Sequence, residues 1–143
     1  MKDNKSLLNK VIWHDIDKHG YITKIFPNQG AVYIYMRISL EDNKISCYVG
    51  SSTMLASRIN THRSYVKNWD KYKNKGCPKF YRSVKKHGWF SFKFGVLEYI
   101  DLSIMEKKQK KKTLLEREQY YLDSINPSLN ICKRVGSAVK RKT

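Results

Sequence analysis

The chain has 143 residues, 41% of them hydrophobic, which suffices for the core of one domain and leaves little for a second. Lysine and arginine outnumber aspartate and glutamate by 29 to 12, so the formal net charge is +17. This excess indicates a polyanionic partner, and no apolar run approaches the length of a membrane span. Because aromatic residues are interleaved with the basic ones, we expect nucleic acid rather than a membrane; a merely soluble, lysine-rich surface is the alternative.

The cysteines indicate an intracellular, reducing compartment. Cys47, Cys77 and Cys132 are an odd, scattered set without a C-x-x-C pair, which argues against a disulfide framework and a structural zinc. The first residues also lack the apolar segment of a secretory signal.

The first half of the chain predicts an extension, a β-hairpin and a helix. Residues 1–28 are polar and weakly patterned, and we expect them to be tucked against a domain at 29–132. Residues 31–38 alternate, with Tyr33 and Tyr35 on one face, and residues 45–49 form the returning strand. Ser52 is the expected N-cap of a helix that runs to about residue 67. Its buried stripe is Leu55, Ile59 and Val66, and its edge carries Arg58 and His62.

The second half predicts a helix, a strand and a long helix. After a basic loop at 68–76, a helix begins near Pro78 and stops at Gly88. Residues 90–96 alternate as a third strand, with a bulge near Gly95. Ser103 opens a second helical stretch, in which the charged residues 107–112 form either a solvated helix or a loop.

The end of the chain predicts a helix, a break and a tail. Helix runs clearly over 113–124, Asn126-Pro127 breaks it, and residues 129–132 return in extended form. Residues 133–143 form a basic tail. The predicted fold is therefore α/β, of the α+β type: a small three-stranded antiparallel sheet flanked by helices.

Several residue types suited to phosphodiester hydrolysis occur at the ends of these elements. An arginine can hold a phosphate in bidentate fashion, one carboxylate can hold a divalent cation, and tyrosine hydroxyls can orient or deprotonate a water. The candidates from the sequence are Tyr33, Tyr48, Arg58, His62, Glu116 and Asn130.

The order and spacing of these residues resemble the GIY-YIG nuclease family. The resemblance lies in Ala31-Val32-Tyr33, in Tyr48-Val49-Gly50 followed by Arg58 and His62, and in 114–123 followed by Asn130. It covers roughly residues 30–132 and is closest to homing endonucleases encoded in fungal mitochondrial introns. The resemblance implies a DNA endonuclease of the mitochondrion that needs Mg²⁺ or Mn²⁺ and no small-molecule cofactor, and that acts as a monomer or transient dimer.

The same resemblance implies a role for each candidate residue. Tyr33 and Tyr48 surround the attacking water, and one of them is the general base. Gly50 lets the strand end pack closely, and Arg58 binds the phosphate with His62 a turn later. Glu116 is the metal ligand and Asn130 braces the site. Non-specific contacts with the DNA backbone are expected from four lysines: Lys67, Lys71, Lys73 and Lys75.

Each candidate also has a plainer interpretation. The tyrosines are also typical sheet-packing residues, and Arg58 and His62 suit a solvated helix edge. Thr113-x-x-Glu116 forms a capping box, although Ser103-x-x-Glu106 supplies an earlier helix start. At the level of function, the alternatives are a non-catalytic nucleic-acid-binding module on the same scaffold and a structure-specific repair nuclease.

Overall fold

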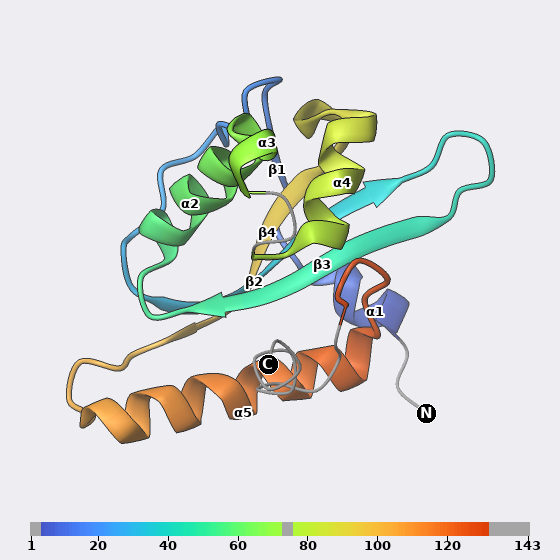
Figure 1. Ribbon diagram of the computed structural model, residues 1–143. Helices are drawn as coiled ribbons and strands as arrows, with labels where there is room; N and C mark the ends of the chain where they lie inside the picture. The colour runs from blue at the N-terminus through green and yellow to red at the C-terminus, as the bar shows by residue number, and fades with distance from the viewer. Residues whose placement is uncertain (1–3, 73–75, 132–143) are drawn as a thin grey trace.

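The computed structural model describes residues 4–72 and 76–131 and contains a four-stranded antiparallel sheet (Figure 1). The strand order is β1-β4-β2-β3, so β3 lies at one edge of the sheet. The strands are β1 (His14–Asp15), β2 (Gly30–Ile38), β3 (Ile45–Ser52) and β4 (Lys93–Ile100). The α+β class and the antiparallel sheet agree with the sequence prediction, and β1 is a short strand in addition to the three expected.

The predicted β-hairpin is present and is longer than expected. Strands β2 and β3 pair from Ala31 with Ser52 to Ile38 with Ile45. The alternation of side chains is as predicted: Tyr33 and Tyr35 belong to one hydrophobic cluster, and Val32 and Ile34 to the cluster on the other face. Strand β3 continues through residues 50–52, which brings Gly50 directly opposite Tyr33.

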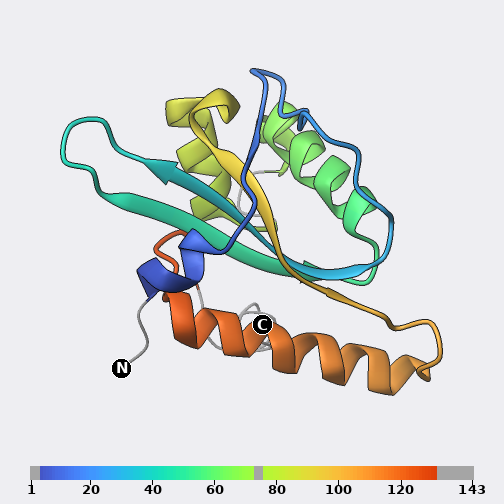
Figure 2. The ribbon, with the colours of Figure 1, turned by 180° about the vertical axis from the view of Figure 1, so that it is seen from behind.

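Helices cover both faces of the sheet. Helices α2 (Leu55–Lys67), α3 (Trp69–Tyr72) and α4 (Pro78–His87) lie on the face that carries Tyr33, and α5 (Lys107–Ile125) and α1 (Asn4–Asn9) lie on the other (Figures 1 and 2). As predicted, Phe80, Tyr81 and Val84 form the buried side of α4. None of the helices in residues 4–72 and 76–131 combines the length and apolar character needed to cross a membrane.

The start of α2 differs from the prediction. Met54, not Ser52, precedes the first helical residue and makes no side-chain capping hydrogen bond; the Asn28 side chain accepts one from the N–H of Ser57 at 3.1 Å. The Ser52 hydroxyl instead exchanges hydrogen bonds with the backbone N–H and C=O of Met54, each at 3.0 Å. The reason is that β3 holds Ser52 in the strand, opposite Ala31, so the turn into α2 begins two residues later.

The third predicted strand also shifts. Residues Trp89–Ser91 form a 3₁₀ turn, and Phe90 is 68% exposed, so the alternation that begins at Phe90 misplaces the strand start. The bulge lies at Leu97 rather than Gly95, because Tyr33 pairs with Val96 while Val32 pairs with Glu98. The predicted change of phase along the strand is therefore confirmed, and it lies two residues later than predicted.

Helix α5 settles the ambiguity at 107–112 in favour of a solvated helix. It is continuous for 19 residues, begins after Glu106 and ends at Asn126, whose φ of +54° stops the helix. Thr113 is in the interior of α5, so Thr113 and Glu116 form no capping box. The buried residues of its sheet-facing side are Leu114, Tyr121, Leu122, Ser124 and Ile125, whereas Leu115 is only half-buried.

The N-terminal extension contributes to both cores. Strand β1 pairs with β4 through His14 and Phe94, Leu8 belongs to one hydrophobic cluster, and Ile16 belongs to the other. The predicted tail at 133–143, together with Lys73, Lys75 and Cys132, lies outside the described residues.

Candidate functional site

Tyr33 and Tyr48 come from neighbouring strands and point to the same face of the sheet, toward α2 and α4. Both rings are buried, with their centroids 6.4 Å apart. Gly50 makes this close arrangement possible, since a Cβ atom at that position would lie 2.6 Å from the Tyr33 hydroxyl oxygen. The absence of a side chain at Gly50 therefore has a physical function: it leaves room for the Tyr33 ring.

His62 lies in the core, not at a helix edge as the sequence suggested. It is 1% exposed, and its Nε2 is 2.6 Å from the hydroxyl oxygen of Tyr33. Its Nδ1 is 2.7 Å from the hydroxyl oxygen of Tyr81. Burial, reinforced by the positive charge of Arg58, lowers the pKa of His62 to about 3. At neutral pH the ring is therefore uncharged, so one nitrogen accepts a hydrogen bond and the other donates one.

The buried, neutral His62 makes the fold sensitive to acid. The folded-state pKa lies below the ordinary value of 6.5, so the unfolded chain takes up this proton first as the pH falls. The contribution is fully present above about pH 6.5 and is lost toward pH 3, with about 3 kcal/mol lost by pH 4 at ~1.36 kcal/mol per pH unit. We expect His62→Gln to remove this part of the acid sensitivity.

Urea unfolding of both proteins at pH 7 and pH 4 measures the effect. The wild type should lose more unfolding free energy between the two values than His62→Gln does. Equal losses in the two proteins would show that His62 does not stay neutral in the fold.

Arg58 occupies the rim of the same group of side chains. It is exposed, one helical turn before His62, and interacts electrostatically with the hydroxyl groups of Tyr33 and Tyr48. Its positive charge also acts on His62 and on Glu118. Arg58 is thus open to solvent in part while its charge reaches both tyrosines.

The carboxylate on which the charge of Arg58 acts belongs to Glu118, two residues after the predicted metal ligand Glu116. Glu116 is exposed, and at about 100° per residue it lies about 200° around α5 from Glu118, on the side away from the sheet. Glu118 accepts a hydrogen bond from the hydroxyl of Ser51, at the end of β3. Burial raises the pKa of Glu118, and the Ser51 hydrogen bond and the charge of Arg58 act in the opposite direction.

The sequence contained a signal for Glu118 that the prediction missed. Glu118 follows Leu114 by four residues and precedes Tyr121 and Leu122 by three and four. It therefore stands in the middle of the apolar stripe that faces the sheet. A carboxylate in such a stripe has a partner or a function, because burying a lone charge is costly.

Asn130 holds the edge strand in place. Its Oδ1 accepts a hydrogen bond from the N–H of Val49 at 2.9 Å, and its Nδ2 donates one to the C=O of the same residue at 2.8 Å. The backbone N–H of Leu129 donates to the C=O of Cys47 at 2.9 Å. The segment after α5 thus satisfies backbone groups at the open edge of β3, next to Tyr48.

Cys77 is a member of the group that the sequence did not single out. Its thiol donates a hydrogen bond to the hydroxyl of Tyr48 at 2.8 Å. Burial raises the pKa of Cys77, against the effects of Tyr48, Tyr81 and Arg58. The residue is therefore a neutral thiol that fixes the direction of the Tyr48 hydroxyl.

Two of the four lysines expected to contact DNA, Lys67 and Lys71, lie within the described residues. Lys67 ends α2, and Lys71 lies in α3 with its Nζ 5.5 Å from the centre of the Tyr72 ring; both are exposed.

The donor set around Glu118 is compatible with magnesium or manganese and not with a cation held by many protein ligands. In residues 4–72 and 76–131 no three His, Cys, Asp or Glu side chains are placed to share an ion. Mg²⁺ keeps several waters and is commonly held by one or two carboxylates together with phosphate oxygens of the substrate. A single carboxylate beside an exposed arginine fits that requirement.

Two comparisons with known proteins give no match and one gives a family. The chain matches no curated protein and no solved structure. Residues 31–130 match the model of the GIY-YIG catalytic domain, a span that contains Tyr33, Tyr48, Arg58, Glu118 and Asn130. The chain belongs to the GIY-YIG superfamily of nucleases, whose members act on DNA.

Proposed function

We propose that the protein is a metal-dependent DNA endonuclease with one active site at the edge of β3. The observation that supports this most directly is that Tyr33 and Tyr48, with ring centroids 6.4 Å apart, converge on one site with the charges of Arg58 and Glu118. These side chains come from four elements that are far apart in the sequence. Together they supply a cation for the phosphate, a ligand for a metal and hydroxyl groups for a water.

Arg58 and Glu118 would hold the scissile phosphate between them. Arg58 is exposed as a residue, and a guanidinium is able to bind two non-bridging oxygens at once. Glu118 would hold the Mg²⁺ or Mn²⁺, kept in position by the Ser51 hydroxyl. When bound, the metal stabilises negative charge on the phosphate and on the leaving oxygen.

The attacking water would be activated by Tyr33 together with His62. Burial raises the pKa of Tyr33 well above its ordinary value, so the free phenolate is not its resting form. The Tyr33 oxygen would take a proton from the water while its own proton passes to Nε2 of His62, 2.6 Å away. Burial and, after it, the charge of Arg58 lower the pKa of His62; a phosphate bound at Arg58 would offset the second of these effects and so favour this transfer. Tyr48, fixed by Cys77, would orient the same water.

Nicking of a supercoiled plasmid tests the activity. With one site per copy, we expect Mg²⁺ or Mn²⁺ to convert the supercoiled form to the open circle, and linear DNA to follow later through a second cut or a transient dimer. An excess of chelator should stop the conversion. Binding to the plasmid without any strand break, at every metal concentration, would instead identify a non-catalytic nucleic-acid-binding module.

A narrower role is that of a homing endonuclease of a mitochondrial intron. The order of motifs around Tyr33, Tyr48 and Asn130 supports this role by resemblance. A structure-specific repair nuclease would prefer branched over linear DNA, whereas a homing enzyme would cut linear DNA at a preferred site. Rates on the two kinds of substrate, measured side by side, separate the two roles.

A further inference from the structure

The outward face of α2 is polar but uncharged, which is unusual in this chain. Three exposed residues of α2 form it, namely Asn60, Thr61 and Ser64, and the exposed Asn68, directly after the helix, continues it four positions beyond Ser64. Lysine and arginine make up 29 of the 143 residues, yet none lies on this stripe. The side chains are short and able to donate and accept hydrogen bonds, the properties used to contact the edges of bases.

Basic side chains lie on both sides of this stripe. At about 100° per residue, Arg58 is on the side of α2 that faces the active site, and Arg63 and Lys67 are on the other side. The helix thus carries a central strip of small polar groups with Arg58 on one side and Arg63 and Lys67 on the other. Such a pattern suits a helix between two phosphate backbones.

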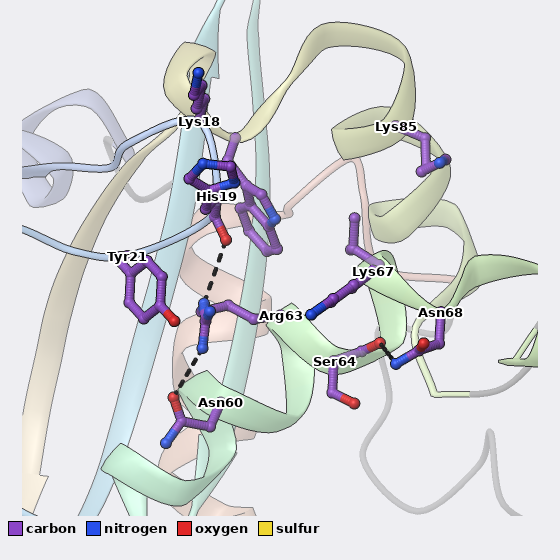
Figure 3. A pocket seen from close by; sticks show the side chains of 11 residues that line it. Lys18, His19, Tyr21, Asn60, Arg63, Ser64, Lys67, Asn68 and Lys85 are labelled. Atoms are coloured by element: carbon purple, nitrogen blue, oxygen red, sulfur yellow. Dashed lines mark hydrogen bonds between the residues drawn. The ribbon is translucent and has the colours of Figure 1, made fainter.

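The side that carries Arg63 opens into a basic pocket of about 780 Å³ (Figure 3). It lies between α2, the end of α4 and the N-terminal segment around His19. Its lining includes Lys18, Arg63, Lys67 and Lys85 and no carboxylate, and the stripe residues Asn60, Ser64 and Asn68 also border it.

Arg63 is held in a fixed position within this pocket. Its Nε donates to the backbone C=O of His19 and one terminal nitrogen donates to Oδ1 of Asn60, both at 3.3 Å. The guanidinium carbon is 3.5 Å from the centre of the Tyr21 ring. No carboxylate pairs with Arg63 within the described part of the chain. The remaining guanidinium N–H groups have no acidic partner in the described part of the chain, and Lys67 lines the same pocket, an arrangement suited to an anion.

We propose that α2 enters the major groove of duplex DNA and that this pocket binds a phosphate of the strand that is not being cut. The inference rests on the proposed function, in which DNA is the substrate and Arg58 holds the scissile phosphate. An α-helix with its side chains is about 10–12 Å across, and the major groove is about 12 Å wide. With α2 in the groove, Asn60 and Ser64 face the base edges, Arg58 faces one backbone, and Arg63 and Lys67 face the other.

The pocket is tested with a double variant that removes two of its positive charges, and a second double variant of the same protein is the matched control. Arg63→Ala/Lys67→Ala and Arg82→Ala/Lys86→Ala each remove one arginine and one lysine at i and i+4 of a helix. Arg82 and Lys86 are exposed on α4, outside the pocket lining. Circular dichroism would show whether both variants fold.

Duplex affinity, measured with chelator present so that no strand is cut, should distinguish the pairs. We expect the Arg63/Lys67 variant to bind on the order of tenfold more weakly, and its salt slope to fall by about 1, roughly 0.9 for the one phosphate contact that is lost. The Arg82/Lys86 variant should bind almost as the wild type does. Equal losses in the two variants would overturn the assignment of the pocket.

The groove itself is tested with modified DNA. A duplex with bulky glucosyl groups on 5-hydroxymethylcytosine blocks the major groove, and a distamycin-type ligand occupies the minor groove. We expect wild-type binding to weaken at least about tenfold with the first and to stay unchanged with the second. The reverse pattern would overturn the placement of α2.

Competition with inorganic phosphate tests whether the pocket simply takes free anions. If millimolar phosphate competed as effectively as duplex DNA does, the cross-groove contact would be overturned. Because all of these measurements are of binding alone, a failure to nick plasmid would contradict the proposed activity without altering them.

Discussion

Replacing Glu118 by glutamine should abolish metal-dependent nicking while the protein stays folded and still binds DNA. The substitution removes the only negative charge placed beside Arg58 and Tyr48 in the described site, and with it the proposed ligand for the metal. We expect the single-turnover rate to fall on the order of 10³-fold, which corresponds to about 4 kcal/mol of transition-state stabilisation. Glutamine keeps an acceptor for the Ser51 hydroxyl, so packing against β3 should be retained.

Glu116→Gln is the matched control for this experiment. It makes the same change in charge and shape two residues away on α5, where the side chain is exposed. We expect it to nick as fast as the wild type. A loss of activity in Glu116→Gln with activity preserved in Glu118→Gln would reverse the assignment of the carboxylate.

Arg58→Ala should slow nicking by about 10²–10³-fold, the range found when one preorganised donor to a developing negative charge is removed. The loss should appear mainly in the rate at saturating DNA, because many other basic residues contribute to binding. Arg58→Lys keeps the charge but cannot bind the phosphate in bidentate fashion, so its rate should lie between those of Arg58→Ala and the wild type.

Single-turnover rates and DNA affinity, each measured at several salt concentrations, decide the role of Arg58. A variant with a normal rate at saturation and a weaker, more salt-sensitive affinity would identify Arg58 as a surface contact only. Arg58 is exposed and lies on α2 away from the packed stripe, so a general loss of folding is not expected from either substitution.

Most of the fold was predictable because its elements follow simple periodicities. The alternation from Val32 to Met36 gave the two faces of β2, and the spacing of Leu55, Ile59 and Val66 gave the buried side of α2. Errors occurred where tertiary pairing overrides local signals. Pairing with Ala31 extends β3 through Ser52, a residue that suits a helix cap, and the alternation from Phe90 gave no sign of the 3₁₀ turn before β4.

The candidate site was predictable in outline and not in its contacts. Tyr33, Tyr48, Arg58 and His62 do converge, as the motif order suggested. The burial of His62 was missed because a polar residue beside an apolar stripe gives the same pattern whether it faces solvent or a buried partner. Its partners, Tyr33 and Tyr81, are 29 and 19 residues away.

Glu116 and Glu118 show that a motif position in the sequence does not by itself identify the side chain that enters the site. Two residues on a helix separate opposite faces, so a motif that contains both carboxylates does not by itself say which one faces the sheet. The buried apolar neighbours of Glu118 show that Glu118 is the one that faces the sheet, because Leu115, next to Glu116, is only half-buried. Contacts such as Cys77 with Tyr48, or Asn130 with Val49, join residues 29 and 81 positions apart and have no local signal.

A crystal structure with duplex DNA and Mn²⁺ would test the central claim most directly, because the anomalous signal of manganese locates the ion. We predict the ion at the Glu118 carboxylate, with a phosphate between it and the guanidinium of Arg58 and the hydroxyl of Tyr33 within reach of a water at that phosphate. An ion bound at Glu116, or a phosphate at Arg58 with Glu118 turned away from it, would contradict the account.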